Sequence, residues 1–451
     1  MRPAFFISFT KQNSFLHIKE VAMRDISWVK ESVFYHIYPI GACGCPRENK
    51  GKETEGHRIL KLIDWVDHLK EIGVNAVYFG PLFESGTHGY DTYDYYKLDS
   101  RLGDNDDLKK LIKTYHDNGI KVVLDGVFNH VGRGHKAVVD VREKRENSEY
   151  KNWISGLNFG GNNWYNDGFS YDCWAGAQEL VKLNYWCEDV NNYILNAVAM
   201  WIDEFDIDGL RLDAADCIQR DFFKRLKNFT QEKKSTFWLM GEIIHGDYNI
   251  YVNEEMLDAV TNYECWKGIY SSHNDHNYFE INYAMKRQWG QGGLYIGKYL
   301  YNFIDNHDVN RIATLLNDKE NIYPVYTLLF TMPGIPSIYY GSEWAIEGDK
   351  KSGDGDYALR PEIDPKKMNN PDLIDHIKTL SQIRKESTAL KCGIYEEVQV
   401  KNETLVFARV YNDEYVIVAL NNTKDSKHLA FDYRGQHFEI DLEPHGSKIL
   451  K

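Results

Sequence analysis

Short hydrophobic runs alternate with longer amphipathic segments along most of the chain. Runs rich in Val, Ile, Tyr and Phe have the length and composition of buried strands, and there are eight of them: 33–40, 75–80, 121–128, 209–215, 237–243, 257–263, 300–308 and 337–343. Segments with helical spacing separate them, as in 59–72, 108–118 and 190–205. Eight strands with interleaved helices predict an α/β fold, specifically a (β/α)8 TIM barrel.

Two regions depart from this alternation. Residues 131–184 are rich in Gly, Asn and Trp and show little helical spacing; so long a connection inside a compact domain is usually functional. We expect an inserted subdomain after strand 3, so that the barrel comprises 31–130 and 185–388. From 389 to 451 the pattern changes to short alternating strands, which predict a C-terminal antiparallel β-sandwich. Their expected ranges are 396–401, 404–411, 415–420, 428–433 and 437–442.

The beginning of the chain has no comparable pattern. Residues 1–30 are interpreted as an N-terminal extension, and 1–22 as a peripheral arm or an upstream start that adds nothing to the fold. The apolar run at residues 4–9 is shorter than the core of a signal peptide. Seven cysteines are scattered and odd in number, which indicates reduced thiols and a cytoplasmic protein.

Charge and composition exclude several classes of partner. Lys and Arg total 53 against 67 Asp and Glu, a net charge of −14, without a long basic run; nucleic acid is therefore not an expected partner. No apolar stretch is long enough to cross a membrane, so no membrane partner is expected. Aromatic residues reach 14%, which suits a cleft for flat, weakly charged ligands.

Four of the predicted strands end in polar clusters, at 125–130, 209–215, 240–243 and 303–308. Taken singly, an acidic residue at a strand end is often only the cap of the next helix. In a (β/α)8 barrel, however, the carboxyl ends of all strands meet on one face, where catalytic groups lie. Four clusters in register therefore predict one site that contains several carboxylates.

These clusters read DGVFNH, GLRLDAAD, GEI and FIDNHD. They resemble, in order, the signature regions of the α-amylase family of glycoside hydrolases (family 13), and the resemblance extends from about residue 33 to the end. The stretch LVKLN at 180–184 is similar to a fifth signature of the neopullulanase, cyclomaltodextrinase and oligosaccharide-acting branch. The resemblance implies a retaining enzyme that cleaves α-1,4-glucosidic bonds in maltooligosaccharides and starch-type α-glucans. The oligomeric state is left open.

The resemblance also assigns roles. It implies that Asp213 is the nucleophile that forms the covalent glycosyl-enzyme, that Glu242 is the general acid/base, and that Asp308 binds sugar hydroxyls with His307. Arg211, two residues before Asp213 and on the same side of the strand, is expected to keep Asp213 ionised. Asp125 and His130 are expected to support the same sugar unit.

Two loops supply the remaining predicted contacts. The resemblance implies that Tyr90 stacks on the sugar at the cleavage point, and that Asp91 and Arg360 form an ion pair that narrows the pocket. Asn129 matches a common calcium ligand of the family, so calcium is a possible metal although no cofactor is required. Calcium needs six to eight oxygen ligands, and one candidate does not make a site.

Two alternatives stay open at this point. A transglycosylase of the same family would use the same residues, because sugar can intercept a covalent intermediate as readily as water can. A catalytically silent, sugar-binding scaffold belongs to a different class. Such a scaffold should have lost part of its acidic triad, whereas Asp213, Glu242 and Asp308 are all present.

Overall fold

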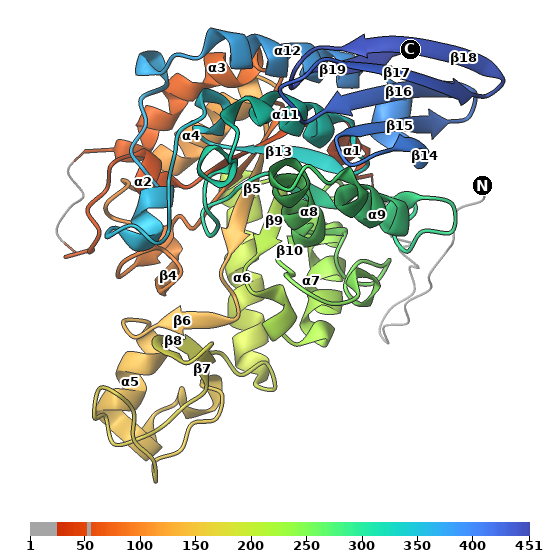
Figure 1. Cartoon of the computed structure of the whole chain (residues 1–451). Coiled ribbons are helices and arrows are strands. Elements are labelled where there is room, and N and C mark those ends of the chain that lie inside the picture. Colours follow the sequence, from red (N-terminus) through yellow and green to blue (C-terminus); the bar gives the residue numbers. More distant parts are fainter. Residues whose placement is uncertain (1–24, 52–55) are drawn as a thin grey trace, which may run out of the picture.

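The computed structural model describes residues 25–51 and 56–451. Its largest sheet has eight strands in the order β11-β10-β9-β5-β2-β1-β13-β12, all paired in parallel. A parallel bridge between Thr261 and Tyr301 joins the two edge strands, so the sheet closes into a barrel (Figure 1). The TIM-barrel prediction is confirmed, and each predicted run overlaps one strand: β1 (Phe34–Ile37), β2 (Ala76–Phe79), β5 (Lys121–Gly126), β9 (Gly209–Leu212), β10 (Trp238–Gly241), β11 (Ala259–Val260), β12 (Tyr301–Phe303) and β13 (Ile335–Tyr339). Only β13 begins before its predicted run, which starts at 337.

Helices cover the outside of the barrel. The predicted helix at 59–72 begins as the 3-10 helix η1 (Arg58–Trp65) and continues as α3 (Val66–Glu71). The β10–β11 connection departs from the (β/α)8 repeat, because its only helical element is the 3-10 turn η5 (Tyr248–Ile250). The other long helices are α4 (Asn105–Asp117), α6 (Glu188–Phe205), α7 (Arg220–Lys233), α8 (Tyr263–Asn274), α9 (Tyr278–Trp289), α11 (Ile322–Thr331) and α12 (Pro371–Glu386).

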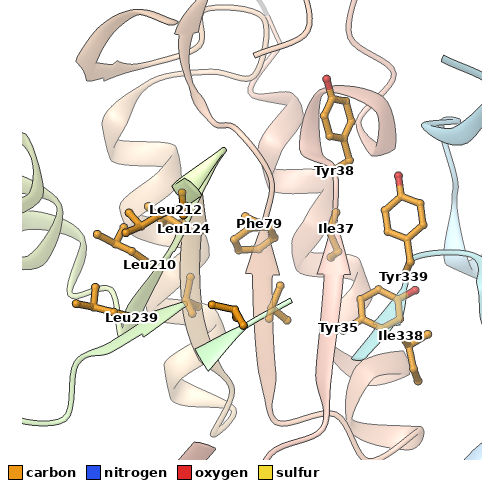
Figure 2. Packing of buried hydrophobic residues seen from close by; sticks show 14 of the residues in the cluster. Tyr35, Ile37, Tyr38, Phe79, Leu124, Leu210, Leu212, Leu239, Ile338 and Tyr339 are labelled. Atoms are coloured by element: carbon orange, nitrogen blue, oxygen red, sulfur yellow. The ribbon is translucent and has the colours of Figure 1, made fainter. Parts of the chain in front are cut away.

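The two-residue period of the strands separates two layers of the core. Outward-facing side chains such as Ile37, Phe79 and Leu210 pack against the helices (Figure 2). Their neighbours in sequence, including Phe34 and Tyr78, belong to a second buried cluster inside the barrel. Residues that follow the strands and keep the inward orientation of Phe34 and Tyr78 therefore point toward the barrel axis, at the carboxyl end of the barrel.

The predicted extension needs a correction at its end. Residues 1–24, and with them the arm predicted at 1–22, lie outside the described residues. Residues 25–30, however, belong to the barrel. Trp28 in α1 (Ser27–Lys30) donates its indole N–H to the Thr236 carbonyl at 3.0 Å, and its ring centroid lies 6.0 Å from Phe34 and 6.2 Å from Trp238. Phe34 and Trp238 are the first residues of β1 and β10, and Thr236 lies two residues before β10. Helix α1 therefore covers the amino end of the barrel.

The inserted segment forms a small subdomain after the third barrel strand, as expected, and extends away from the barrel (Figure 1). Its sheet has the order β6-β8-β7, with β6 (His130–Gly132), β7 (Cys173–Trp174) and β8 (Ala177–Lys182). It also contains helix α5 (Lys136–Lys144), which the pattern did not predict because only Ala137, Val138 and Val141 supply its buried face. The hairpin strands β3 (Phe83–Ser85) and β4 (Thr92–Leu98) lie in the loop after β2.

The C-terminal sandwich is confirmed, with one strand more than predicted. One sheet contains β14 (Ile394–Val400), β15 (Thr404–Tyr411), β16 (Glu414–Asn421) and β19 (Ser447–Leu450), the added strand. The other contains β17 (Lys427–Tyr433) and β18 (Gln436–Leu442). Apolar side chains from both sheets, such as Ile417 and Phe431, form their common core. The Asn282 side-chain amide of α9 donates to Glu397 of β14 at 2.5 Å and so ties this unit to the barrel helices.

The structure also bears on the predicted cysteine thiols and on membrane-spanning helices. All seven cysteines are free, which agrees with the predicted reduced thiols. Within residues 25–51 and 56–451, no helix has both the length and the apolarity that a membrane crossing requires.

Candidate active site

The Arg211 guanidinium is buried at the centre of a group of carboxylates. Its Nη1 lies 3.0 Å from Asp125 Oδ1 and 3.0 Å from Asp213 Oδ1, and its Nη2 lies 2.9 Å from Glu242 Oε2. Strand register explains this meeting, because Arg211 in β9 pairs with Asp125 in β5 on one side and with Met240 in β10, two residues before Glu242, on the other. The backbone N–H of Ala214 also donates to Glu242 Oε2 at 3.1 Å. Three carboxyl groups thus share one fixed cation.

Asp308 lies in the same site and is held in the ionised form. Arg360 Nη2 is 2.9 Å from Asp308 Oδ1, and His307 Nε2 is 2.9 Å from Asp308 Oδ2. The Asp308 backbone N–H donates to Asn306 Oδ1 at 2.8 Å, a turn that fixes the direction of the side chain. Burial opposes ionisation, but His307 and Arg360 outweigh it and hold the pKa of Asp308 well below its usual range.

The expected Asp91–Arg360 ion pair is wrong. Both residues are described, yet Arg360 pairs with Asp308 and, at 3.7 Å, with Asp356. The Asp91 carboxylate instead accepts the backbone N–H and the hydroxyl of Thr87, both at 3.1 Å. These local hydrogen bonds hold Asp91 on its own loop, and Arg360 contacts Asp308 instead.

Tyr90 and His130 complete the contacts around Asp125 and Asp213. The Tyr90 ring lies against His307, with centroids 5.4 Å apart and planes 12° apart, and its hydroxyl donates to Asp125 Oδ2 at 3.2 Å. His130 Nε2 lies 3.8 Å from Asp213 Oδ2. Burial lowers the pKa of His130 to about 3, so this ring is neutral at neutral pH.

Nine of the ten predicted protein contacts for the sugar therefore form one connected network. Asp91 is outside it although it adjoins Tyr90. The connected residues are Tyr90, Asp125, His130, Arg211, Asp213, Glu242, His307, Asp308 and Arg360.

The charge balance around Asp213 differs from the expectation. Burial raises the pKa of Asp213 well above its ordinary value; Arg211 opposes this rise, and Glu242 adds to it. Arg211 does not offset the rise because it is shared with Asp125 and Glu242. The Asp213 carboxyl therefore loses its proton at a higher pH than an isolated aspartate does.

Three further residues contact this network and were not singled out in the sequence. The Tyr263 hydroxyl donates to Glu242 Oε1 at 3.3 Å, and the Tyr78 hydroxyl donates to Asp125 Oδ2 at 2.7 Å. His36 is buried with its ring against Tyr78, with centroids 4.3 Å apart. For Tyr78 and His36 the inward strand register was the one available signal, because Tyr78 lies two residues after Ala76 and His36 two residues after Phe34. Tyr263 begins helix α8, and no strand period marks it.

The surroundings of Asn129 do not gather the acidic oxygens that calcium favours. Its side-chain amide nitrogen lies 3.2 Å from His130 Nδ1, and its backbone carbonyl oxygen accepts the Leu183 N–H at 3.0 Å. Among the described residues, one group of three acidic, His or Cys side chains has its ligand atoms all within 4.8 Å of one another: His57, Asp104 and Asp107, at the start of α4. Calcium at Asn129 stays a prediction, and no step of the chemistry proposed for the site involves it.

Three carboxyl groups on adjacent barrel strands share one cation, and a fourth, ionised carboxylate lies beside them. This arrangement suits a glycosidase site at the carboxyl end of a TIM barrel. The catalytic domain of α-amylase matches residues 53–391 of the chain, and the α-amylase C-terminal domain matches residues 393–438. The protein belongs to the α-amylase family and is an O-glycosyl hydrolase of that family.

Individual relatives agree with the branch suggested by the fifth signature. The chain is 31% identical over 420 residues to a cyclomaltodextrinase of a Bacillus species, covering 88% of this chain and 74% of the relative. It is 30% identical over 434 residues to a maltogenic α-amylase of Bacillus acidopullulyticus, covering 90% and 72%. An acarbose-soaked structure of a debranching enzyme from Nostoc punctiforme matches with a TM-score of 0.81 at 28% identity, covering 95% of this chain and 99% of that one.

Proposed function

We propose that the protein hydrolyses α-1,4-glucosidic bonds of linear and cyclic maltooligosaccharides with retention of configuration. One observation carries the proposal: Asp213 and Glu242 contact Nη1 and Nη2 of the same guanidinium, at 3.0 and 2.9 Å. A cation placed between two carboxyl groups in this way suits a separation of about 5–5.5 Å, at which one carboxylate attacks directly and no water fits between them.

The first step transfers the glycosyl unit to the enzyme. Asp213 attacks the anomeric carbon while Glu242 gives its proton to the glycosidic oxygen, so that the C–O bond breaks and the leaving chain departs as an alcohol. In the second step Glu242 removes a proton from water, and the water oxygen attacks the same carbon. This releases the Asp213 carboxylate and reprotonates Glu242; two inversions give net retention.

The remaining network stabilises the positive charge that develops on the sugar ring. Asp308 keeps a negative charge because His307 and Arg360 hold it ionised. The interaction between an ionised carboxylate and the sugar whose hydroxyls it accepts strengthens as the ring becomes oxocarbenium-like. The opposite charges attract each other more in the transition state than in the ground state. Tyr90 provides a flat face beside the same sugar.

The names of the relatives support the substrate class and the location. Cyclomaltodextrinase and maltogenic α-amylase are the names of relatives that align with most of the chain, and an intracellular maltogenic amylase of Bacillus subtilis is 27% identical over 429 residues. Together with seven free cysteines, this supports a cytoplasmic enzyme that meets α-glucan oligosaccharides. Fractionation of cells that produce the tagged protein tests the location.

A trapping experiment tests the mechanism. E242Q should lose about 10²–10⁴-fold in kcat on maltoheptaose, yet retain attack on α-maltosyl fluoride, whose fluoride leaves without a proton. The intact-protein mass should then rise by one maltosyl unit, located on the peptide that contains Asp213, and D213N should show no such adduct. An adduct elsewhere, or initial release of the β-anomer from maltoheptaose by the unmodified enzyme, would refute the assignment. Net formation of longer chains at high maltose concentration would favour transfer over hydrolysis.

A further inference from the structure

A small cavity lies where the C-terminal sheet meets the amino end of the barrel. Its walls come from the segments that precede β12 and β13, from the end of α13 (Thr388–Cys392) and from β14 and β15. Its volume is about 30 Å³, which is the space of about two water molecules. Three basic residues line it, Lys298, Lys391 and Arg409, and none of the described residues that line it is acidic.

Arg409 reaches this cavity because of its position in β15. Its neighbour Ala408 packs inside the C-terminal sandwich, whereas Phe407, two residues before Arg409, packs on the core shared with the barrel. The alternation of side chains along a strand therefore turns Arg409 toward the barrel, and it is 1% exposed. Its Nη1 donates to the Thr331 carbonyl at 2.6 Å, and its Nη2 donates to the Gly393 carbonyl at 2.7 Å.

The third nitrogen of this guanidinium is left over. Arg409 Nε is buried and has no hydrogen-bond partner among the residues that the structure describes. A buried N–H of a charged group is unfavourable without an acceptor, because it has given up its hydrogen bond to water. Since Arg409 also lines the cavity, an acceptor located there would satisfy this group.

A second buried guanidinium lies beside the first. Arg384 of α12 is 2% exposed and donates to the carbonyls of Phe330, Gly334 and Leu390, at 3.1, 2.7 and 3.0 Å. Both guanidinium groups therefore bind the same two segments, 330–334 and 390–393, and each uses only carbonyl oxygens. Burial lowers the pKa of Arg384 to about 10, and burial together with Arg384 lowers the pKa of Arg409 well below its ordinary value.

The described acidic residues do not offset these two charges. Neither Arg384 nor Arg409 forms an ion pair with a carboxylate of the described chain. Glu31, whose charge also acts on Arg384, is already paired with Lys391 Nζ at 2.7 Å. Two buried like charges with neutral partners only are unfavourable, and a bound anion would compensate both.

We propose that this cavity binds a small inorganic anion of halide size, which accepts the Arg409 Nε–H and offsets the charges of Arg409 and Arg384. Its volume suits a single such ion and is too small for a sugar or a nucleotide. Hydrogen bonds from charged donors are stronger than those from neutral donors, so the ion strengthens the attachment of β15 to the barrel. The site lies at the end of the barrel opposite the catalytic carboxylates, and its role is structural.

Bromide in place of chloride makes the ion visible by anomalous X-ray scattering. Crystals of the full-length protein grown in sodium bromide should show an anomalous peak at hydrogen-bond distance from Arg409 Nε. Arg311 is the internal control, because its Nε is also buried without a partner among the described residues. Arg311, however, bonds to Ser342 Oγ at 3.2 Å, and Ser342 in turn donates to the Asp305 carboxylate at 2.8 Å. A carboxylate therefore already acts on Arg311, and no bromide peak is expected beside it.

Thermal unfolding measures whether the ion stabilises the protein. At constant ionic strength, replacing gluconate, which is too large for the cavity, with chloride should raise the melting temperature by about 2 °C. R409Q removes the cation and should abolish this rise. C392M should abolish it as well, because the longer side chain fills the cavity while both arginines stay. C392S is the matched control, since it keeps the size of the side chain and should retain the rise.

The outcomes decide the proposal in each case. The absence of a bromide peak at Arg409 overturns it. A peak at Arg409 in a protein whose melting temperature does not respond to chloride overturns it too, because it shows an adventitious ion only. An equal chloride-dependent rise in C392M and C392S would place the stabilising ion elsewhere and overturn the assignment. If R409Q fails to fold, C392M and C392S still decide, because both retain Arg409.

Discussion

The Arg360 guanidinium lies 2.9 Å from the Asp308 carboxylate and donates from Nε to the His307 carbonyl oxygen at 3.0 Å. Arg360 follows β13 and Asp308 follows β12, so one side chain joins two neighbouring loops at the carboxyl end of the barrel. Its guanidinium also lies over the Tyr38 ring, 4.6 Å from the centroid. A buried cation fixed on three sides sets both the direction and the ionisation of Asp308.

Replacing this cation should impair catalysis through Asp308. In R360M the pKa of Asp308 rises because the opposing positive charge is gone. We expect kcat/KM for maltoheptaose to fall about 100-fold and the acidic limb of its pH profile to move to higher pH, since Asp308 then needs a higher pH to ionise. Steady-state kinetics across pH measures both effects.

A double-mutant cycle distinguishes the observed pairing from the pairing with Asp91. R360M and D308N should be strongly non-additive in kcat/KM, because they remove two halves of one contact. R360M and D91N should be additive within about 0.5 kcal/mol, because Asp91 bonds to Thr87 instead. Coupling above 1 kcal/mol between Arg360 and Asp91 would contradict the structure.

Asp125 should influence the pH at which Asp213 becomes active. The pKa of Asp213 is raised by burial and by neighbouring carboxylates including Asp125, which also competes for Arg211. D125N removes that negative charge, so the pKa of Asp213 should fall and its ionised form should persist to lower pH. The acidic limb of kcat/KM should move to lower pH by about one unit.

The control for this shift is D167N. Asp167 is also paired with an arginine, Arg133 at 2.8 Å, but it lies in the inserted subdomain. D167N should therefore leave the acidic limb where it is. An upward shift in D125N, or equal shifts in D125N and D167N, would show that Asp125 does not act on Asp213 through its charge.

Tyr263 should hold Glu242 in position through its hydroxyl. The Tyr263 oxygen donates to Glu242 Oε1 at 3.3 Å and accepts the Asn306 amide N–H at 3.1 Å. Y263F removes both bonds and leaves the ring, so kcat should fall about ten-fold with the melting temperature nearly unchanged. Y115F is the comparison, because it removes one buried phenol bond, to the Leu62 carbonyl at 2.8 Å, away from the site. A kcat loss in Y115F equal to that in Y263F would make the effect one of general stability.

The barrel and the acidic residues were predictable because their signals are periodic and local. Each strand is a short apolar run; Asp213 and Glu242 follow β9 and β10 directly, and Asp308 lies in the loop after β12. Parallel topology then places all strand ends on one face, so no knowledge of loop shape is needed to bring the three carboxyl groups together.

The contacts that escaped prediction depend on features that sequence periodicity does not contain. Tyr263 and Tyr78 look like ordinary apolar core. Their hydroxyls reach Glu242 and Asp125 only because Tyr263 begins α8 beside the barrel and Tyr78 faces inward in β2. Arg360 belongs to a loop without period, so its partner was assigned by resemblance and assigned wrongly. Helix α5 has a buried face of only three residues, too few to stand out in a Gly- and Asn-rich segment.

Asp208 joins a strand, a helix and a connecting segment below the catalytic face. It is 1% exposed, and its carboxylate contacts His116 Nε2 at 2.7 Å and accepts from Lys121 Nζ at 2.9 Å and from the Val122 N–H at 3.0 Å. Burial opposes ionisation, but the bond from His116 and the other cations outweigh it and hold the pKa of Asp208 below its ordinary value. The group is therefore ionised in the folded protein under all ordinary conditions.

Removing this charge should destabilise the barrel in a pH-dependent way. A carboxyl group whose pKa is lower in the folded state stabilises the protein fully above its unfolded pKa of about 3.9, and this contribution is lost as pH falls below that value. D208N should therefore lose about 3 kcal/mol of unfolding free energy near neutral pH, and the difference should shrink below about pH 4. D203N breaks a pair with Lys233 in which Asp203 is 59% exposed, so it should cost less than about 1 kcal/mol. Urea unfolding of the three proteins across pH measures the difference, and a D208N loss no larger than that of D203N would mean that the cost of burying Asp208 cancels its bonds.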